Sequence, residues 1–436
     1  MADSYLKDFY QRLDLKPLVA GAQEYVPIYE GALHAADPVQ VLHKAITWAE
    51  QESAHLFSGF RGTGKSTELR RLQALLERDG EYVVVRCDMS EYLNLGTPVD
   101  VSDFLLAVAG ALGDGIAARL GDGDPIVEGY WTRFLAFLER TNVHIEGVEL
   151  GSTNAGAALK LNLKQDPTIR QRIQKRMMGH LGALVEDVRA YVTECVLALS
   201  APLGAEVQLV LLLDSLEQIR GSTMNAEEVA SSLVQLFHGH ADKLSLPLLH
   251  VVYTLPPWLK IREPGITQHF KTATIVPCVK VATREGQVYA PGLDAMEQVV
   301  CKRGDWKRLL GGRDRLDKLI LASGGHFREL FRLLRAVLMR ATDASLPVSD
   351  EVVERAIEEV RQNYLPIAHD DAQWLARIDH THAAELQRFG DLHQLARFLD
   401  NMLVLSYRNG DAWWAVHPLV RDEVRRQVLG ADGARP

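Results

Sequence analysis

The sequence predicts an α/β fold in which helices sandwich a parallel β-sheet. Residues 82–85 and 207–213 are near-continuous apolar runs that end close to Asp88 and Asp214, respectively. Strands of this composition suit a parallel sheet whose two faces are both covered by helices. A third apolar run, residues 55–58, leads through a glycine-rich turn directly into a helical pattern. We therefore expect the sheet and its covering helices to form one base.

Periodicity and capping residues predict the other elements of this base. Asn225 as N-cap, with Glu228 three positions later, marks the start of a helix over residues 226–237. A further buried strand is expected at 248–254. The remaining predicted helices cover residues 38–51 and the stretch after the glycine-rich turn, whose apolar face carries Leu69, Leu72 and Leu76.

A long insertion, residues 96–203, separates two of these strands. Within it, residues 143–150 and 157–163 alternate polar with apolar side chains, which predicts a half-exposed β-hairpin. One long helix is expected to start at Asp166 and Pro167 and to continue to Leu199, because apolar side chains recur at spacings of three and four. The helix is interpreted as packed along the core, and the alternative gives the hairpin a contact surface for a partner or nucleic acid.

The sequence after residue 283 predicts helices and then a small terminal domain. We place the base at residues 1–282, a helical lid at 283–364 and a separate domain at 365–436. In the last of these, a helix over 392–402 precedes two short strands that flank Asn409 and Gly410, a strong hairpin signal. Helices followed by a terminal hairpin are the outline of a winged helix.

Length and charge narrow the class of protein. The chain has 436 residues, so two or three domains are expected, and its formal net charge is −9. A negative overall field repels nucleic acid, so any DNA binding requires a local basic patch. The four cysteines include no C-x-x-C pair, which indicates neither a zinc site nor a disulfide framework. The polar N-terminus and the shortness of the apolar run 209–213 predict a cytosolic protein without a membrane span.

The glycine-rich turn fits the phosphate-binding loop (P-loop) pattern G-x-x-x-x-G-K-[ST], with a strand before it and a helix after it. Backbone N–H groups of such a loop and the positive end of the helix dipole bind the phosphates of a nucleotide. We expect Lys65 to reach the β- and γ-phosphates of ATP and the Ser66 hydroxyl to bind Mg²⁺. The predicted nucleotide-binding residues in this segment are Gly59, Phe60, Arg61, Gly62, Thr63, Gly64, Lys65, Ser66 and Thr67.

A carboxylate at the end of a neighbouring strand completes such a site. Asp214 ends the apolar run 207–213 and is predicted to hold Mg²⁺ as the Walker B aspartate. Ser215 follows it, so the next acid is Glu217, three positions beyond Asp214. Glu217 is a candidate for orienting the attacking water, and the alternative is a solvated residue with a structural role only. We expect ATP hydrolysis to be slow.

These features together resemble the AAA+ and STAND-type P-loop ATPases, with a layout most similar to the origin-recognition initiator clade. The likeness rests on the P-loop with its Asp214 strand, on the terminal hairpin domain and on one turn, Gly324-Gly325-His326-Phe327-Arg328. The spacing of Asp214 and Glu217 also resembles that of NACHT-like signalling ATPases. The resemblance covers most of the chain. It implies the additional-strand sheet order, ATP bound between base and lid, and a winged helix hinged after the lid.

The resemblance also implies roles for residues outside the P-loop. Thr254, at the tip of strand 248–254, is similar to a sensor 1 residue that touches the γ-phosphate or the attacking water. Arg262 stands near the position of an arginine finger that reaches a neighbouring subunit, and the alternative is a surface arginine. Arg328 resembles sensor 2, which reads the γ-phosphate from the lid. Tyr25 and Val26 would line the adenine, and the alternative is a packed arm.

Three functional hypotheses follow. The first is an ATP-driven, oligomerising switch that controls a protein partner or effector, in prokaryotic signalling or defence. The second is an initiator or loader that binds double-stranded DNA through the winged helix, supported by Arg421, Arg425 and Arg426. In the third, ATP is a structural ligand of a scaffold that scarcely hydrolyses it. The first hypothesis fits the charge pattern best, because Asp422 and Glu423 dilute the terminal arginines.

Overall fold

The computed structural model describes residues 4–29, 36–120, 129–140, 164–203, 207–222, 224–383, 391–407 and 413–432. The chain divides into two compact units. Unit 1 comprises Met1–Pro38, Gly59–Arg71 and Val276–Pro436, and unit 2 comprises Val39–Ser58 and Leu72–Ile275. The two units are described in turn, and the three predicted domain ranges stay a prediction.

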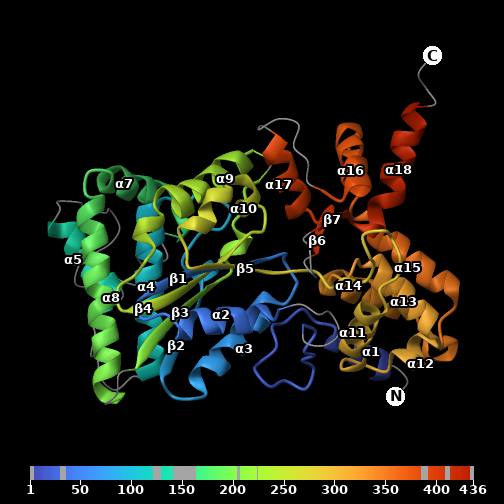
Figure 1. The fold of residues 1–436 in the computed structure, drawn as a ribbon, viewed down its shortest axis with the longest axis horizontal. Helices are drawn as coiled ribbons and strands as arrows, with labels where there is room; N and C mark the ends of the chain where they lie inside the picture. Colours follow the sequence, from blue (N-terminus) through green and yellow to red (C-terminus); the bar gives the residue numbers. More distant parts are fainter. Residues whose placement is uncertain are drawn as a thin grey trace. The chain divides into compact units, whose positions relative to one another are not determined.

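Unit 2 contains nearly all of a five-stranded sheet with the order β2-β3-β4-β1-β5 (Figure 1). The pairs β1 with β4, β2 with β3, and β3 with β4 are parallel. The central strands β3 and β4 are buried along almost their whole length, which explains their near-continuous apolar sequences. This confirms the predicted α/β class. The strands are β1 (Ser53–Gly59), β2 (Tyr82–Asp88), β3 (Gln208–Asp214), β4 (Leu249–Leu255) and β5 (Thr272–Val276).

The strand order also confirms the additional-strand arrangement, because β4 lies between β1 and β3. Four strands were predicted to within a few residues, whereas the edge strand β5 was missed. Its residues are partly exposed, so the short run lacks the continuous apolar signal of the others. The helices of this base include α2 (Pro38–Thr47), α3 (Lys65–Glu77), α9 (Ala226–Val234) and α10 (Leu259–Arg262).

The predicted capping box of helix α9 is wrong. Asn225 is the N-cap residue, but its side chain makes no hydrogen bond to the helix. Instead, its Oδ1 atom accepts hydrogen bonds from the backbone N–H and the hydroxyl of Ser222, at 2.7 and 2.9 Å. This local Asn-Ser contact replaces the cap because side chains of both types compete readily for nearby backbone groups. At its other end α9 continues into a π-helical turn, Gln235–Gly239.

In its described residues, the insertion contributes four helices to unit 2: α4 (Val101–Leu120), α5 (Tyr130–Arg140), α7 (Pro167–Met177) and α8 (Leu181–Leu203). Helix α4 packs against β2 on one side and against the other three helices, and α4 and α8 lie side by side in Figure 1. The single long helix predicted from Asp166 to Leu199 is therefore wrong. A turn at residues 178–180 divides it, and Gly179 in that turn is a poor helix former. The predicted hairpin at 143–150 and 157–163 lies outside the described residues.

Helix α4 is long and apolar enough to cross a membrane by composition alone. In its apolar segment Val101–Arg119, 72% is buried inside the protein. Burial of this extent is typical of a central helix in a globular core, because helices packed on all sides are apolar all round. The sequence prediction considered only the shorter run 209–213 and overlooked this segment.

Unit 1 is mainly helical after residue 283, as predicted. Helix α1 (Ser4–Arg12) packs against α14, and α13 contacts α11, α12, α14 and α15. The apolar faces of these helices are buried together, including Leu319 and Leu334, which are fully buried. The helices of this region are α11 (Ala290–Cys301), α12 (Trp306–Leu310), α13 (Arg313–Ala322), α14 (Phe327–Leu338) and α15 (Asp350–Gln362).

The C-terminal part of unit 1 contains the predicted hairpin. Strand β6 (Val404–Tyr407) pairs in antiparallel register with β7 (Trp413–Val416). The turn residues Asn409 and Gly410 lie outside the described residues. Helix α16 packs against α18 and β7, so the helices and the hairpin share one small core. The winged-helix assignment stays a prediction. The helices are α16 (His369–Thr381), α17 (Leu392–Asp400) and α18 (Pro418–Asp432).

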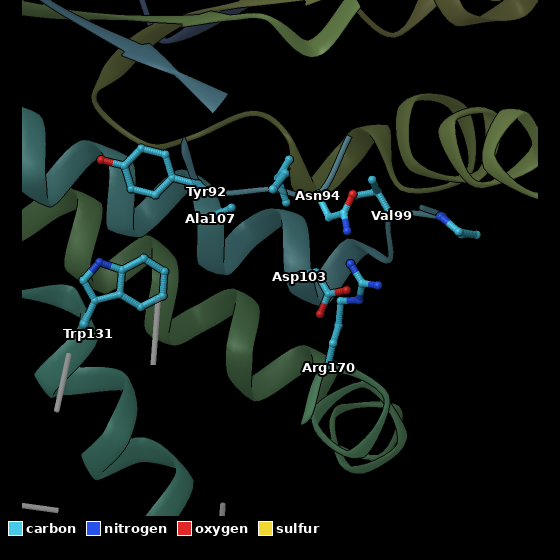
Figure 2. A pocket seen from close by; sticks show the side chains of 9 residues that line it. Tyr92, Asn94, Val99, Asp103, Ala107, Trp131 and Arg170 are labelled. Carbon is cyan, nitrogen blue, oxygen red and sulfur yellow. The ribbon is translucent and has the colours of Figure 1, made fainter. Parts of the chain in front are cut away.

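A small cavity lies between α4 and the insertion helices of unit 2. Its volume of about 10 Å³ is enough for one water molecule. Figure 2 shows the Asp103 carboxylate beside the Arg170 guanidinium, with the ring of Trp131 also lining the space. Asp103 is 7% exposed, and its Oδ2 atom accepts a hydrogen bond from Gln174. Burial raises the pKa of Asp103 to about 7, although Gln174 and Arg170 lower it.

We expect Asp103→Asn to stabilise the protein at high pH. Because the folded-state pKa lies above the unfolded value of about 3.9, the native state binds more protons between these values and loses stability as the pH rises through them. The cost, on the order of 4 kcal/mol, is developed in full only above about pH 7. Chemical unfolding of Asp103→Asn should therefore show a gain at pH 8 and little change at pH 4. The exposed Asp242→Asn serves as control, and equal gains at both pH values would contradict the expectation.

Candidate nucleotide-binding site

The P-loop of unit 1 folds into a closed ring around its lysine. The buried Lys65 donates hydrogen bonds from Nζ to the carbonyl oxygens of Gly59 and Phe60, at 2.9 and 2.8 Å. The Thr63 hydroxyl donates to the same Phe60 carbonyl at 2.9 Å. Gly64 has a φ of +95°, a left-handed conformation that favours glycine. The loop is therefore held in shape by hydrogen bonds from its own side chains to its own carbonyl groups.

Helix α3 starts at Lys65, directly after this ring. Its first backbone bond runs from the Glu68 N–H to the Gly64 carbonyl at 3.0 Å, so the N–H groups before it have no partner inside the helix. These groups and the helix dipole make the N-terminus of a helix favourable for an anion. A second observation, the cationic side chains around the loop, points to the same ligand chemistry.

Arg328 lies against the P-loop. A Cβ atom at Gly62 would be 2.7 Å from the Cβ of Arg328 and 2.8 Å from its Nε, closer than real side chains approach. Gly62 also has a φ of +89°, so both space and backbone conformation require glycine here. The Nε atom of Arg328 is buried and has no hydrogen-bond partner among the described residues. Burial lowers the pKa of Arg328, and the neighbouring Arg61 lowers it further.

The turn before Arg328 also places a buried histidine beside the P-loop. His326 is fully buried, and burial lowers its pKa to about 3, with further lowering by Arg328 and Lys65. The ring therefore stays neutral at physiological pH, and it fills space beside the loop without adding charge. The sequence named this residue only as part of a turn. Nothing in its local pattern indicated that it would be buried.

The N-terminal arm is held to the first turns of α3. The Tyr25 hydroxyl donates to Glu68 Oε1 at 3.3 Å, and Arg71 contacts the Tyr25 hydroxyl and forms ion pairs with Asp37 and Glu68. Burial raises the pKa of Glu68 to about 7, Arg71 lowers it and Asp37 raises it. This is the packed arm that the sequence left open as an alternative.

Two further predicted nucleotide-binding residues, Val26 and Thr67, lie in or against the arm. Val26 is buried, and the hydroxyl of Thr67 accepts a hydrogen bond from the Leu18 N–H at 3.0 Å. The adenine contacts of Tyr25 and Val26 stay a prediction. The polar cluster of Tyr25, Asp37, Glu68 and Arg71 was not foreseen, because it joins residues far apart in the sequence.

In unit 2, the carboxyl ends of β1, β3 and β4 share one edge of the sheet. There the buried Asp214 accepts a hydrogen bond at Oδ1 from the Ser215 N–H, at 2.8 Å. Ser215 has a φ of +72°, in the left-handed region that non-glycine residues rarely adopt. The fully buried Thr254 spans this turn, donating to the Leu213 carbonyl at 3.1 Å and accepting from the Leu216 N–H at 3.0 Å. Thr254 thus braces the backbone on both sides of Asp214.

Glu217 lies in a short 3₁₀ turn, Leu216–Gln218, that follows directly. Its side chain is 8% exposed, so the alternative of a solvated Glu217 is wrong. Burial of a carboxylate is costly unless the group has a structural or chemical role. A structural role and the orienting of water both stay predictions for Glu217.

Arg262 is engaged within its own chain. It ends helix α10, forms an ion pair with Glu227 and donates a hydrogen bond to the Ser231 hydroxyl at 3.0 Å. Its side chain is only 11% exposed. A finger role in a neighbouring subunit would require Arg262 to leave these contacts, and it stays a prediction.

The residues predicted to hold Mg²⁺ have suitable chemistry. Asp214 supplies a carboxylate and Ser66 a hydroxyl, and Mg²⁺ prefers oxygen ligands. Within the described ranges there is no group of three metal-ligating side chains. In nucleotide sites, Mg²⁺ is usually held by one or two protein ligands together with phosphates and water.

Thr254→Val should destabilise the protein and slow any turnover. Valine has the same shape but removes the hydroxyl that binds the Leu213 carbonyl and the Leu216 N–H, at a cost of about 1–3 kcal/mol. Thermal and chemical unfolding measure this cost. Thr193→Val, which removes a hydroxyl bound to a helix carbonyl, is the matched control. Equal stability of Thr254→Val and wild type would contradict the bracing role.

The sheet order, the P-loop after β1 and the aspartate at the end of β3 define a P-loop nucleotide-binding fold of the additional-strand class. This conclusion rests on connectivity and on the geometry of the loop, and it agrees with the class predicted from the motif.

The sequence matches no protein-family model and no curated protein. Among solved structures, the chain is similar to the Aeropyrum pernix ORC2 protein in its ADP form, with a TM-score of 0.44, 11% identity and coverage of 98% of each chain. It is similar to the Walker-type ATPase PABY2304 of Pyrococcus abyssi, with a TM-score of 0.43, 12% identity and coverage of 95% of this chain and 99% of that one. It is also similar to Cdc6p from Pyrobaculum aerophilum, with a TM-score of 0.39, 14% identity and coverage of 95% of this chain and 100% of that one. TM-scores below 0.5 do not establish a shared fold, so the class rests on the strand order and the loop.

Proposed function

We propose that this chain is a cytosolic ATP-binding switch of the AAA+ or STAND type that hydrolyses ATP slowly and controls a protein partner or effector. The observation that carries the proposal is the cationic setting of the P-loop. Lys65 lies inside the loop, Arg328 lies against Gly62, and Arg61 is close enough to lower the pKa of Arg328. A triphosphate supplies the negative charge that such a cluster favours.

In this proposal each residue has one task. The loop N–H groups bind the β-phosphate, Lys65 neutralises the β- and γ-phosphates, and Arg328 contacts the γ-phosphate. Ser66 and Asp214 would hold Mg²⁺, and the metal would supply positive charge to the phosphoryl group that is transferred. Glu217 orients the attacking water. Because Ser215 stands where many AAA+ enzymes have a glutamate, turnover is expected to be slow.

Arg328 also gives the switch a means of reporting nucleotide state. It lies at the start of α14, in the predicted lid, so loss of the γ-phosphate removes one of its contacts and changes the preferred position of the helix. Nucleotide-dependent homo-oligomerisation belongs to the same proposal, with Arg262 released from Glu227 to serve a neighbouring subunit.

The test measures nucleotide binding, ATP turnover and the mass of the protein in solution. Purified wild type and Glu217→Gln are titrated with ATP and ADP by calorimetry, assayed for phosphate release, and weighed with and without ATP. The switch predicts ATP binding, slow turnover that Glu217→Gln reduces, and an ATP-dependent change in mass. Binding without turnover in either protein would favour the non-hydrolysing scaffold. Absence of binding would overturn the proposal.

The arginines that would bind DNA in the alternative hypothesis form ion pairs within the chain. Arg421 and Arg425 each form an ion pair with Asp379 at 2.9 Å, and Arg426 pairs with Glu423 at 2.8 Å. All three arginines therefore have acidic partners within the C-terminal part of the chain. Retention of duplex DNA at low salt, lost in a variant with the three arginines changed to alanine, would nevertheless favour an initiator or loader.

A further inference from the structure

A glycine turn in unit 1 presents Arg328 to the P-loop. Gly325 has a φ of +74°, and a Cβ atom there would lie 1.8 Å from the carbonyl oxygen of Val279. The backbone of the turn is fixed at this contact, because the Val279 N–H donates to the Gly325 carbonyl at 3.1 Å. Only glycine fits at position 325, and the contact with Val279 restricts the movement of the turn.

The C-terminal hairpin holds the other side of the same turn. The Tyr407 hydroxyl, at the end of β6, donates to the Gly324 carbonyl at 2.7 Å. A Cβ atom at Gly324 would be 2.5 Å from the Leu405 side chain and 3.0 Å from that of Pro418. Tyr407 is itself fixed, since its ring is buried and stacks on Trp413 at a centroid distance of 4.5 Å.

The path from this contact to the P-loop is short. Gly324 precedes Arg328 by four residues, and helix α14 begins between them, with the Leu330 N–H bonded to the His326 carbonyl at 3.0 Å. A shift of the Gly324 carbonyl therefore moves the first turn of α14, and Arg328 moves with it. The Arg328 side chain packs against Gly62 with no spare space, so a small displacement changes the contact.

We propose that Tyr407 is a positioning residue for Arg328, and that the β6–β7 hairpin is thereby a working part of the nucleotide site. This inference rests on the proposed function, because it assigns the nucleotide-sensing arginine a support in another part of unit 1. By thermodynamic reciprocity, any partner that displaces the hairpin changes the affinity for ATP, and ATP changes the affinity for that partner by the same factor.

The test is a double-mutant cycle on nucleotide discrimination. The measured quantity is the ratio of dissociation constants for ADP and for a non-hydrolysable ATP analogue, adenylyl imidodiphosphate. Arg328→Ala should shift this ratio by about 10- to 100-fold toward ADP, because it removes a charged contact to the γ-phosphate. Tyr407→Phe removes one hydroxyl and should shift it by about 3- to 10-fold in the same direction.

In the Arg328→Ala background, Tyr407→Phe should add no further shift, because Tyr407 acts through Arg328. Tyr5→Phe is the matched control: it removes a tyrosine hydroxyl that donates to the Asp305 carbonyl elsewhere in unit 1. A purely structural role for Tyr407 would lower the melting temperature and leave the ratio unchanged. That result, or equal shifts with and without Arg328, would overturn the inference while the proposed function stands.

Failure of wild type to bind either nucleotide would overturn the proposed function itself. Hydrogen exchange on the wild type gives an independent measurement, which needs no variant to fold. The ATP analogue should protect residues 404–407 together with residues 323–330, and ADP should protect both less. Protection of 323–330 alone would also overturn the positioning role.

Discussion

Replacing Lys65 with alanine should lower the affinity for ATP by at least about 100-fold and remove turnover. The lysine ammonium is expected to bind two phosphates through charge-assisted hydrogen bonds, each worth about 1.5–3 kcal/mol. Calorimetric titration and phosphate release measure the two effects.

Lys65 also binds the carbonyl oxygens of Gly59 and Phe60, so loop stability needs its own control. Thermal unfolding without nucleotide separates a loosened loop from a lost ligand contact. Arg70→Ala removes a cation from the same helix, one that donates to the Pro17 carbonyl at 2.7 Å, and should leave ATP affinity within about threefold of wild type. An unchanged affinity in Lys65→Ala would place the nucleotide elsewhere.

Replacing Asp214 with asparagine should reduce turnover by about 100-fold or more while the protein still binds nucleotide. The amide oxygen of asparagine can still accept the hydrogen bond from the Ser215 N–H, so the turn is preserved and only the negative charge is lost. The dependence of ATP affinity on Mg²⁺ concentration should weaken in the same variant, because a metal ligand has become neutral.

Asp88 offers a matched control for this prediction. It ends the neighbouring strand β2, in register with Asp214, and its Oδ1 atom accepts a hydrogen bond from the Ser90 N–H at 2.9 Å. Asp88→Asn should therefore leave Mg²⁺ dependence unchanged. Equal loss of turnover in both variants would show that charge at this edge of the sheet matters generally, rather than Asp214 as a metal ligand.

The strands and the P-loop were predictable because their signals are local. Buried parallel strands are continuous apolar runs, and the loop motif specifies four residue types at fixed places within eight consecutive positions. Strand β5 lacks a continuous apolar run, because it lies at an edge of the sheet and is partly exposed. The break between α7 and α8 was missed because apolar spacing continues through Gly179 although the helix does not.

Pairings across long sequence distances could not be predicted. The sequence offered Arg262 as an arginine finger or a surface arginine, and its ion pair with Glu227 could not be foreseen because it depends on how α9 and α10 pack. Thr254 was identified as polar at a strand tip, yet its use in bracing the Asp214 turn depends on the register of β3 and β4. Arg328 is the exception, because a short turn motif predicted a place near the P-loop and the structure places it against Gly62, while its role at the γ-phosphate stays a prediction.

The left-handed Ser215 restricts how this protein could acquire faster hydrolysis. A glutamate at position 215 would inherit the φ of +72°, which costs a non-glycine residue about 1–2 kcal/mol, and its side chain would leave the backbone in a different direction from that of a strand residue. A single substitution would therefore not recreate the adjacent acid of faster ATPases. The backbone would first have to return to an extended conformation, which breaks the hydrogen bond from the Leu216 N–H to Thr254. Under the proposed function, slow turnover would thus follow from the main chain at this turn, and a path to a faster enzyme would require several coordinated changes.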